Sequence, residues 1–489
     1  MAYVFGDGFD CYTTMADSVA GYWDSGLGVN ALWTLVAGRF SGSQACQTAG
    51  GSAVLLVKSS GQNDAVHHIT VAFRQTAALS GSTLPLYFQL TDNLTNQCCV
   101  VFRSDGAMLL TSATPGGTVL DTYPGAVTAQ NTWVAFEIEI VIHNTAGSWA
   151  VRKNGNTSND RTTGSLNTRP GANAYANKLT VGINSSINAQ QIDDLLWRSD
   201  ASSVPWVGDI RAYTRMPASD AAVQFARAPN PVSAIPTTGV VTTVSKAANA
   251  GCMAAFVAAY SGTIASGVVS ILTGATGNMK AAIYDSTRAI VLATSNAVVN
   301  PVSGSNAITF GVPLAVTKGT TYYLAVDQDA TIVYNSTSAN QYLFTTAYVS
   351  FPAASPVTTF SSNAAGFTLN ITPTVNAEFV NETTQDGTTS YVYDSTVNDA
   401  DFYTIAPIAV TPISVVAVTT RGFLQKSDAG TRGAAVQLKS GATTVTSTAT
   451  LLSSSWGWLW RTDLTDPATG AAWTAAAVNN VQIGPKVTS

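Results

Sequence analysis

The sequence predicts an all-β protein made of several β-sandwich or jelly-roll domains, with one domain nested inside another. Charged residues make up only 10% of the 489 residues, against ~25% in typical globular proteins. Glutamate occurs only four times, and the chain is rich in threonine, serine, asparagine, glycine, alanine and valine. Little glutamate and lysine disfavours helices, and abundant threonine and valine favour strands and turns.

The charge pattern argues against nucleic acid and membrane partners. The net charge is −5 and no basic run is present to neutralise phosphates. No stretch approaches the ~20 apolar residues of a membrane span. Residues 1–10 (MAYVFGDGFD) have neither the basic nor the apolar region of a secretory signal. We therefore expect the protein to be made and assembled in a cytoplasm.

The cysteines and histidines predict neither a disulfide framework nor a metal cofactor. There are five cysteines and three histidines, and no CxxC motif occurs. Cys98 and Cys99 are adjacent on an expected strand, so their side chains should point to opposite faces. Reduced, buried thiols fit this arrangement better than disulfides do.

Residues 1–205 show the spacing of a β-sandwich, in which short apolar runs alternate with turn residues. The clearest strand is 133–142 (WVAFEIEIVI), in which apolar residues alternate with Glu137 and Glu139. Residues 148–153 form the next strand, and Asn154-Gly155 after it is a strong turn signal. Further strands are expected at 53–57, 68–73, 86–90, 98–103, 178–183 and 192–197.

The opening motifs FGDGFD (residues 5–10), Tyr12 and Tyr22-Trp23, followed by the strands above, resemble concanavalin-like (laminin-G-like) domains of bacteriophage structural proteins. The resemblance covers about the first 200 residues. It implies a lectin or glucanase type of β-sandwich.

A second domain begins near residue 206 and is interrupted. GDIRAYTRMP (208–217), DGTTSYVYDS (386–395) and TDPATGAAWTAAAVNN (465–480) resemble a small β domain that follows the lectin-like one in such phage proteins. We therefore assign 206–230 plus 376–489 to one discontinuous domain, and expect residues 379–395 to pair with or pack against residues 208–227. Thr474 should cap a short helix that finishes the chain.

The interrupting segment, 231–375, is expected to be an inserted module. MKAAIYDSTRAIVLATS (279–295) reads as strand, turn and strand, and VTKGTTYYLAVD (316–327) as a turn leading into a strand. These pieces resemble a jelly-roll module of extracellular bacterial and phage proteins, often found at carbohydrate-binding sites. Insertion at an exposed loop of the host domain is physically reasonable.

Paired carboxylates are the first candidates for catalysis. Glycosidases of the concanavalin-like fold need two acids across a cleft, and the catalytic strand of the resembling glycanases carries Glu-x-Asp-x-Glu. Here the strand reads EIEIVI and lacks the second pair of acids. Alternation alone predicts Glu137 and Glu139 to be solvated. Asp193 and Asp194 should face opposite sides of a strand, so they should not act as a pair, although one could help bind calcium.

The remaining candidates have structural alternatives. His67, His68 and His143 are not accompanied by a nucleophile elbow. Trp456, Trp458 and Trp460 should share one face of a strand, as a sugar-stacking platform or, in our preferred interpretation, as a core or subunit contact. Tyr322 and Tyr323 should face opposite sides. No catalytic, cofactor or metal residue is therefore assigned.

The sequence favours a bacteriophage virion protein of the tail, neck or fibre that is not an enzyme. It would work through contacts with other virion proteins and through adhesion to a host-surface glycan, for which the inserted module is the better candidate. A homo-oligomer is expected, with a trimer by analogy to fibres. Its location would be the virion, after assembly in the bacterial host cytoplasm. The alternatives are a glycan-degrading tail enzyme and a bacterial surface lectin or adhesin.

Overall fold

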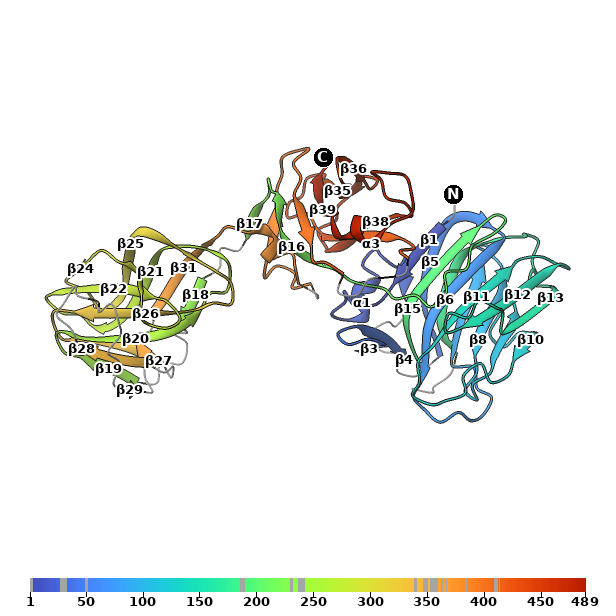
Figure 1. The fold of residues 1–489 in the computed structure, drawn as a ribbon, viewed down its shortest axis with the longest axis horizontal. Helices are drawn as coiled ribbons and strands as arrows, with labels where there is room; N and C mark the ends of the chain where they lie inside the picture. Colours follow the sequence, from blue (N-terminus) through green and yellow to red (C-terminus); the bar gives the residue numbers. More distant parts are fainter. Residues whose placement is uncertain are drawn as a thin grey trace. The chain divides into compact units, whose positions relative to one another are not determined.

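The structure is a computed structural model that describes residues 3–489. Excepted from the description are residues 27–32, 49–51, 185–189, 229–231, 236–241, 338–340, 346–350, 352–358, 362–363, 366, 383–384, 409–411 and 413. Within the described residues the helices are all short: α1 (Met15–Ser18), the 3₁₀ helix η1 (Asn376–Phe379) and α3 (Ala475–Asn479). None of these helices is long and apolar enough to cross a membrane. The remaining regular structure is antiparallel sheet, which confirms the predicted all-β class (Figure 1).

The chain folds into two compact units, and each is described by itself. The first unit comprises Met1–Ala222, Glu382–Gly387 and Ser395–Ser489, and the second comprises Val223–Asn381 and Thr388–Asp394. In sequence, the second unit therefore lies between segments of the first. The division into three domains at 205, 230 and 375 stays a prediction.

Two sheets form the sandwich at the start of the first unit. Sheet A has the order β13 (Arg161–Leu166), β12 (Gly147–Lys153), β11 (Val134–Val141), β6 (Val66–Gln75), β15 (Gln190–Asp200), β4 (Gln44–Thr48) and β3 (Trp33–Ala37), with β1 (Tyr3–Asp7) paired to β15. Sheet B has the order β10 (Val119–Tyr123), β9 (Met108–Ser112), β8 (Asn96–Phe102), β7 (Leu86–Thr91), β14 (Ala176–Asn184), β5 (Ser52–Asp64) and β2 (Ser25–Gly26). All eight strands predicted in this region are present.

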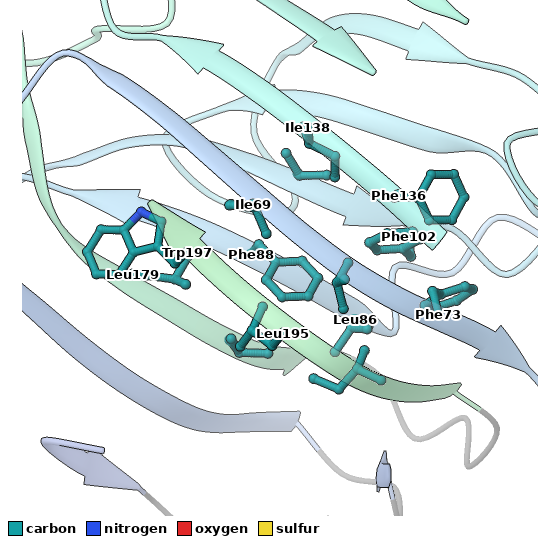
Figure 2. Packing of buried hydrophobic residues seen from close by; sticks show 14 of the residues in the cluster. Ile69, Phe73, Leu86, Phe88, Phe102, Phe136, Ile138, Leu179, Leu195 and Trp197 are labelled. Carbon is teal, nitrogen blue, oxygen red and sulfur yellow. The ribbon is translucent and has the colours of Figure 1, made fainter. Parts of the chain in front are cut away.

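The core of the sandwich is apolar and rich in aromatic rings (Figure 2). Side chains from both sheets meet there, including Ile69, Phe73, Leu86, Phe88, Phe102, Phe136, Ile138, Leu179, Leu195 and Trp197. The rings of Phe73 and Phe102 stack with centroids 4.2 Å apart. The alternation in β11 places Phe136 and Ile138 in this core, so Glu137 and Glu139 must lie on the outer face of sheet A.

Two local predictions in the sandwich are confirmed. Cys98 lies in the core between the sheets, whereas Cys99 packs in a small cluster on the other face of sheet B. All five cysteines are free and buried. Asn154 and Gly155 have φ values of 50° and 76°, the pair of left-handed residues that a type I′ turn requires.

The end of the chain adds a third sheet to the first unit. Sheet C has the order β16 (Pro217–Ala222), β33 (Phe402–Ile405), β39 (Gln482–Val487), β35 (Gly433–Ser440) and β36 (Thr443–Thr446), with β37 (Thr450–Leu451) on β35. Thr474 caps α3 by accepting a hydrogen bond from the amide of Ala477. The expectation that this helix finishes the chain is wrong, because β39 follows it and pairs between β33 and β35.

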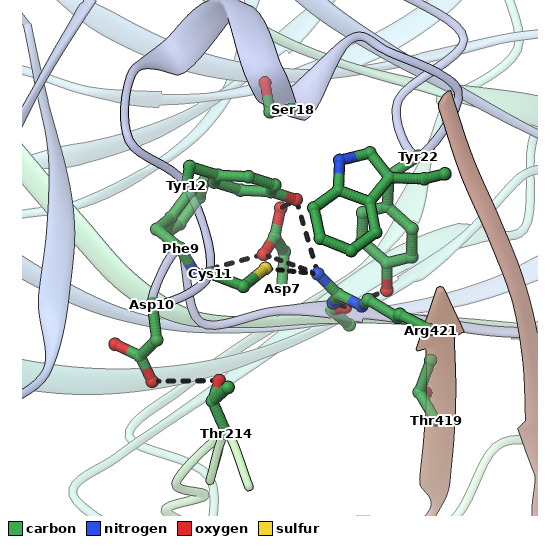
Figure 3. A network of polar contacts seen from close by, with 12 residues as sticks. Asp7, Phe9, Asp10, Cys11, Tyr12, Ser18, Tyr22, Thr214, Thr419 and Arg421 are labelled. Carbon is green, nitrogen blue, oxygen red and sulfur yellow. Dashed lines mark hydrogen bonds and ion pairs between the residues drawn. The ribbon is translucent and has the colours of Figure 1, made fainter. Parts of the chain in front are cut away.

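A two-stranded ribbon fastens the end of the chain to the sandwich. It consists of β34 (Val418–Leu424) and β38 (Gly457–Asp463). Arg421 of β34 lies 3.5 Å over the ring of Tyr22, 3.6 Å from a carboxylate oxygen of Asp7, and donates to the carbonyl of Gly6 (Figure 3). Burial of this guanidinium is compensated because Asp7 and Tyr22 supply negative charge and a ring face.

The second unit is also a two-sheet sandwich. Sheet D has the order β18 (Val232–Ile235), β31 (Phe367–Pro373), β21 (Gly262–Thr273), β27 (Ile332–Thr337) and β19 (Thr242–Lys246), with β25 (Gly304–Val316) on β21 and β30 (Ala364–Ala365) on β27. Sheet E has the order β23 (Val291–Thr294), β22 (Asn278–Tyr284), β26 (Thr321–Gln328), β20 (Ala250–Val257), β28 (Gln341–Thr345) and β29 (Thr359–Ser361), with β24 (Val298–Val299) on β22. The predicted strand–turn–strand at 279–295 corresponds to β22 and β23.

The two ends of the interruption meet in the second unit. β17 (Ala226–Ala228) pairs with β32 (Tyr391–Tyr393) in a short antiparallel ribbon. The pairing of residues 379–395 with residues 208–227 is therefore confirmed. Arg227 of β17 donates to the side chain of Asn376 and to the carbonyl of Pro373.

Candidate functional site

The outer face of sheet A brings four ionisable side chains together across three neighbouring strands. In the strand register Glu139 of β11 is opposite His68 of β6, and His68 is opposite Arg198 of β15. Glu137 lies two residues before Glu139 on the same face. We refer to His68, Glu137, Glu139 and Arg198 as the carboxylate–histidine cluster.

The cluster is held by short polar contacts. The Nε2 atom of His68 lies 2.8 Å from Oε2 of Glu139, and its Nδ1 atom lies 3.6 Å from Oε1 of Glu137. Nη2 of Arg198 donates to the same Glu137 oxygen at 3.0 Å. One histidine ring therefore lies between two carboxylates, and an arginine fixes one of them.

Residues 204–208 cross over this cluster; we call this segment the strap. The backbone N–H of Val207 donates to Oε1 of Glu137 at 2.7 Å, and that of Gly208 donates to Oε2 at 2.8 Å. The Trp206 ring packs edge-on against His68 with centroids 4.8 Å apart. The strap covers Glu137 more completely than Glu139, whose side chain is 28% exposed against 2% for Glu137.

Glu137 is an ionised acceptor in this arrangement. Burial by itself would raise the pKa of Glu137, but the nearby His68 ring, the bonds from Val207 and Gly208 and the charge of Arg198 outweigh it and hold the pKa below its usual value. The prediction that both glutamates are solvated is wrong for Glu137. The alternation predicts the outer position of both glutamates, but nothing in the local pattern indicates that residues 204–208 cover this face.

Asp193 and Asp194 belong to a second polar group on sheet A. The pairing of β15 with β6 shifts register between Asp193 and Leu196, and Asp194 has a φ of 52°. The prediction that the two side chains face opposite sides is therefore wrong, because alternation holds only in an unbulged strand. Burial raises the pKa of Asp194 to about 7, helped by the neighbouring charge of Asp193, and burial also raises that of Asp193.

This group also includes Asp10 and Arg39. Asp10 accepts from the amide of Gln44 at 2.7 Å, and burial raises its pKa to about 6. Nη1 of Arg39 lies 3.8 Å from Oδ2 of Asp194, an oxygen with no hydrogen-bond partner. Among the described residues no group of three or more histidine, cysteine or acidic side chains has the arrangement of a metal site.

The other two histidines lie away from the cluster. His67 is buried in the core, stacks on Trp197, and its Nε2 atom lies 2.9 Å from the carbonyl of Asp64. Burial lowers the pKa of His67 to about 4. His143 follows β11, and its Nδ1 atom accepts from the amides of Thr145 and Ala146. Both rings have structural roles.

The aromatic candidates divide as the alternation predicts. Trp458 and Trp460 pack against the sandwich core, and Leu459 between them lies in a separate cluster. The preferred interpretation of a core contact is confirmed for these two tryptophans. Trp456 stacks on Phe423 at 5.5 Å. Tyr322 faces the core of the second unit.

One residue of the second unit was missed by the sequence reasoning. Asp327 of β26 is completely buried, and neither of its carboxylate oxygens has a hydrogen-bond partner. By alternation it lies on the face of sheet E that carries Tyr284, Tyr323 and Ala325. Burial raises the pKa of Asp327 to about 6. Its sequence context, the apolar strand TYYLAVDQ, could have indicated a buried acid.

No protein-family model and no curated protein matches the chain. Several solved structures are similar to it. A carbohydrate esterase from the Shiga toxin-encoding bacteriophage phi24B is 14% identical and covers 41% of this chain and 98% of its own, with a TM-score of 0.29. The catalytic domain of a glycoside hydrolase family 131 protein from Coprinopsis cinerea is 13% identical, with 43% and 98% covered and a TM-score of 0.30. Lectin II from Ulex europaeus is 8% identical, with 41% and 98% covered and a TM-score of 0.26.

The prediction that the protein is not an enzyme is corrected by these findings. The similar structures include a carbohydrate esterase and a glycoside hydrolase as well as a lectin. The prediction depended on the absence of an acid pattern from one strand. One strand is too narrow a basis for such a prediction, because side chains that lie together in a folded protein can come from several strands, as those of the carboxylate–histidine cluster do.

Proposed function

We propose that the chain is a component of a bacteriophage virion, in the tail, neck or fibre, that engages glycans of the host surface. The carboxylate–histidine cluster carries the glycan part of this proposal. Carboxylate, guanidinium and imidazole groups suit sugar hydroxyls. All these groups are gathered on the outer face of one sheet.

The virion part of the proposal is supported by the opening motifs of the chain and by its composition. Repeated copies of a charge-poor surface repel each other weakly, so symmetric packing costs little electrostatic energy. The partners would be other virion proteins and further copies of this chain, with a trimer by analogy to fibres. Assembly would take place in the cytoplasm of the bacterial host.

Binding to host-surface polysaccharide tests the glycan role. Glu139→Gln removes the charge of the most exposed acid of the cluster, and we expect it to weaken binding of the purified protein several-fold. Asp428→Asn is the matched control, because Asp428 is exposed and pairs only with Arg432 and nearby backbone. If both variants bind the polysaccharide as well as the parent protein does, the cluster is not the glycan-binding site.

The same comparison tests the inserted module. Asp327→Asn changes its buried acid and leaves sheet A untouched. A loss of binding in this variant alone would assign the glycan to the second unit, as the sequence predicts.

A second candidate function is hydrolysis of the glycan. It is favoured by the two carboxylates on either side of the His68 ring, since glycoside hydrolysis uses a pair of acids in different protonation states. Purified protein should then release reducing ends, or a carboxylic acid from an esterified polysaccharide. Glu137→Gln and Glu139→Gln should each abolish the release. Product formed equally by both variants would exclude this cluster as the catalyst.

A further inference from the structure

The strap binds Glu137 in the way that a ligand with two neighbouring donors would. Two consecutive amides, those of Val207 and Gly208, donate to the two oxygens of one carboxylate. Two adjacent hydroxyls of a sugar ring present donors in a similar pairwise arrangement, and carboxylates accept such bidentate contacts readily. Arg198 keeps the carboxylate in place from the other side.

Aromatic packing and one backbone bond complete the grip on the strap. The Trp206 ring lies against His68, and the guanidinium of Arg152 lies 4.0 Å from the centre of the same ring. Nη1 of Arg198 donates to the carbonyl of Pro205 at 2.7 Å. The strap is therefore attached by the side chains of the cluster and of Arg152, by its own buried Val204, and by the pair of Arg39 with Asp209 directly after it.

The strap nevertheless fills the site incompletely. Nδ1 of His68, Oγ1 of Thr70 and Nε of Arg198 are buried and have no hydrogen-bond partner. These three atoms lie on the same face of sheet A, since Thr70 is two residues from His68 and opposite Glu137 in the register. Buried polar atoms are usually paired, so a better partner than the strap would have three further groups to bond.

The strap lies in a segment without regular structure. Residues 201–216 contain no helix or strand, and Pro205 is exposed while Trp206, Val207 and Gly208 are half-buried. Gly208 has a φ of 77°, which glycine adopts without strain. A change at this one residue can redirect the strap while β15 stays in the sheet.

We infer that residues 204–208 are a displaceable strap over a saccharide site, in which Glu137 accepts two neighbouring sugar hydroxyls once the strap has left. This inference rests on the proposed glycan function and adds the site and its closed state. A site that is open for only a fraction of the time binds with an affinity reduced by that fraction. Loosening the strap should therefore strengthen binding.

Two variants loosen the strap independently. Trp206→Ala removes the covering ring, and Arg152→Ala removes the cation that stacks on it. We expect faster hydrogen exchange at the Val207 and Gly208 amides in both variants. Affinity for at least one of three probes, cellohexaose, chitohexaose and maltohexaose, should rise about tenfold. Adding Glu137→Gln to either variant should cancel the gain.

Arg74→Ala is the matched control. Arg74 is on the same strand as His68 and stacks on Trp133 at 4.7 Å, so Arg74→Ala removes a cation–ring contact away from the strap, together with a hydrogen bond to Gln191. Its exchange and binding should equal those of the parent. The inference of a displaceable strap would be wrong if hydrogen exchange were unchanged in both loosened variants. It would also be wrong if exchange were faster but none of the three probes bound more tightly. If the parent protein still binds host polysaccharide, the proposed function stands without it.

Discussion

Two buried carboxylates, one in each unit, show how differently a sheet can accommodate an acid. Glu137 on sheet A receives two backbone amides and a guanidinium, and its pKa lies below the usual value. Asp327 on sheet E has no hydrogen-bond partner for either oxygen, and burial raises its pKa to about 6. Both lie on faces turned away from the main core of their sandwich.

The difference shows that the number of donors decides the state of a buried acid. Burial disfavours the charged form of either side chain. At Glu137 the donors more than offset this cost, so the charge is retained and the strap is ordered by it. At Asp327 the nearby backbone of Gln328 offsets only part of this cost, so the side chain takes up a proton more readily, and its charged form weakens the folded state.

The largest expected effect comes from removing a donor at Glu137. Arg198→Met keeps most of the volume but leaves the carboxylate with one fewer partner. Breaking a buried ion pair from one side costs about 3 kcal/mol, so the free energy of unfolding of the first unit should fall by that amount. Chemical denaturation followed by tryptophan fluorescence measures it.

The control for this variant is Arg432→Met, which breaks the exposed pair with Asp428. Exposed pairs contribute little, so stability should stay unchanged within error. Equal stabilities of the two variants would mean that Glu137 does not depend on Arg198.

Substitution of Asp327 is expected to raise the free energy of unfolding, whereas substitution of Arg198 lowers it. Its folded-state pKa is raised to about 6, whereas the unfolded value is near 3.9. The folded state therefore binds the extra proton between about pH 4 and 6, and stability falls as pH rises through this window. Asp327→Asn should raise the free energy of unfolding by about 2 kcal/mol at pH 8 and by almost nothing at pH 4. Thermal unfolding at the two pH values checks this.

A loss of stability in Asp327→Asn at pH 8 would contradict the view that the ionised Asp327, unlike Glu137, destabilises the folded state. It would show that the ionised carboxylate has a favourable partner after all. Glu137→Gln, measured in parallel, should lower stability at pH 8, because an amide accepts the Val207 and Gly208 hydrogen bonds less well.

The sequence was sufficient for strands and faces because both depend on local pattern. The alternation in WVAFEIEIVI placed Phe136 inward and Glu137 outward, as observed. The Asn154-Gly155 turn and the Thr474 cap were also predicted, since each depends on residues adjacent in the chain.

The candidate site could not be predicted in the same way. It depends on which strands are neighbours: β11, β6 and β15 come from three separate parts of the chain, and their order brings Glu139, His68 and Arg198 together. Composition does not encode that order. The bulge at Asp194 was missed because no glycine or proline marks it.

Asp194 lies between the two extremes in its partners, because it has one hydrogen-bond donor and one distant cation. One of its oxygens accepts from the amide of Ala212 at 2.7 Å, while the other has only the guanidinium of Arg39 at 3.8 Å. Its pKa is raised to about 7 by burial and by Asp193. The folded state should therefore become less stable as pH rises from about 4 to 7, because the side chain loses its proton in this range.

Asp194→Asn should flatten this part of the pH profile of the first unit. The amide oxygen can keep the bond from Ala212. The pKa of about 7 already includes the attraction to Arg39, so we expect a net gain of a few kcal/mol in the free energy of unfolding at pH 8 and almost none at pH 4. A net loss would mean that the arginine stabilises Asp194 as fully as Arg198 stabilises Glu137, and a single well-placed amide with a distant cation would then be enough to keep a buried acid charged.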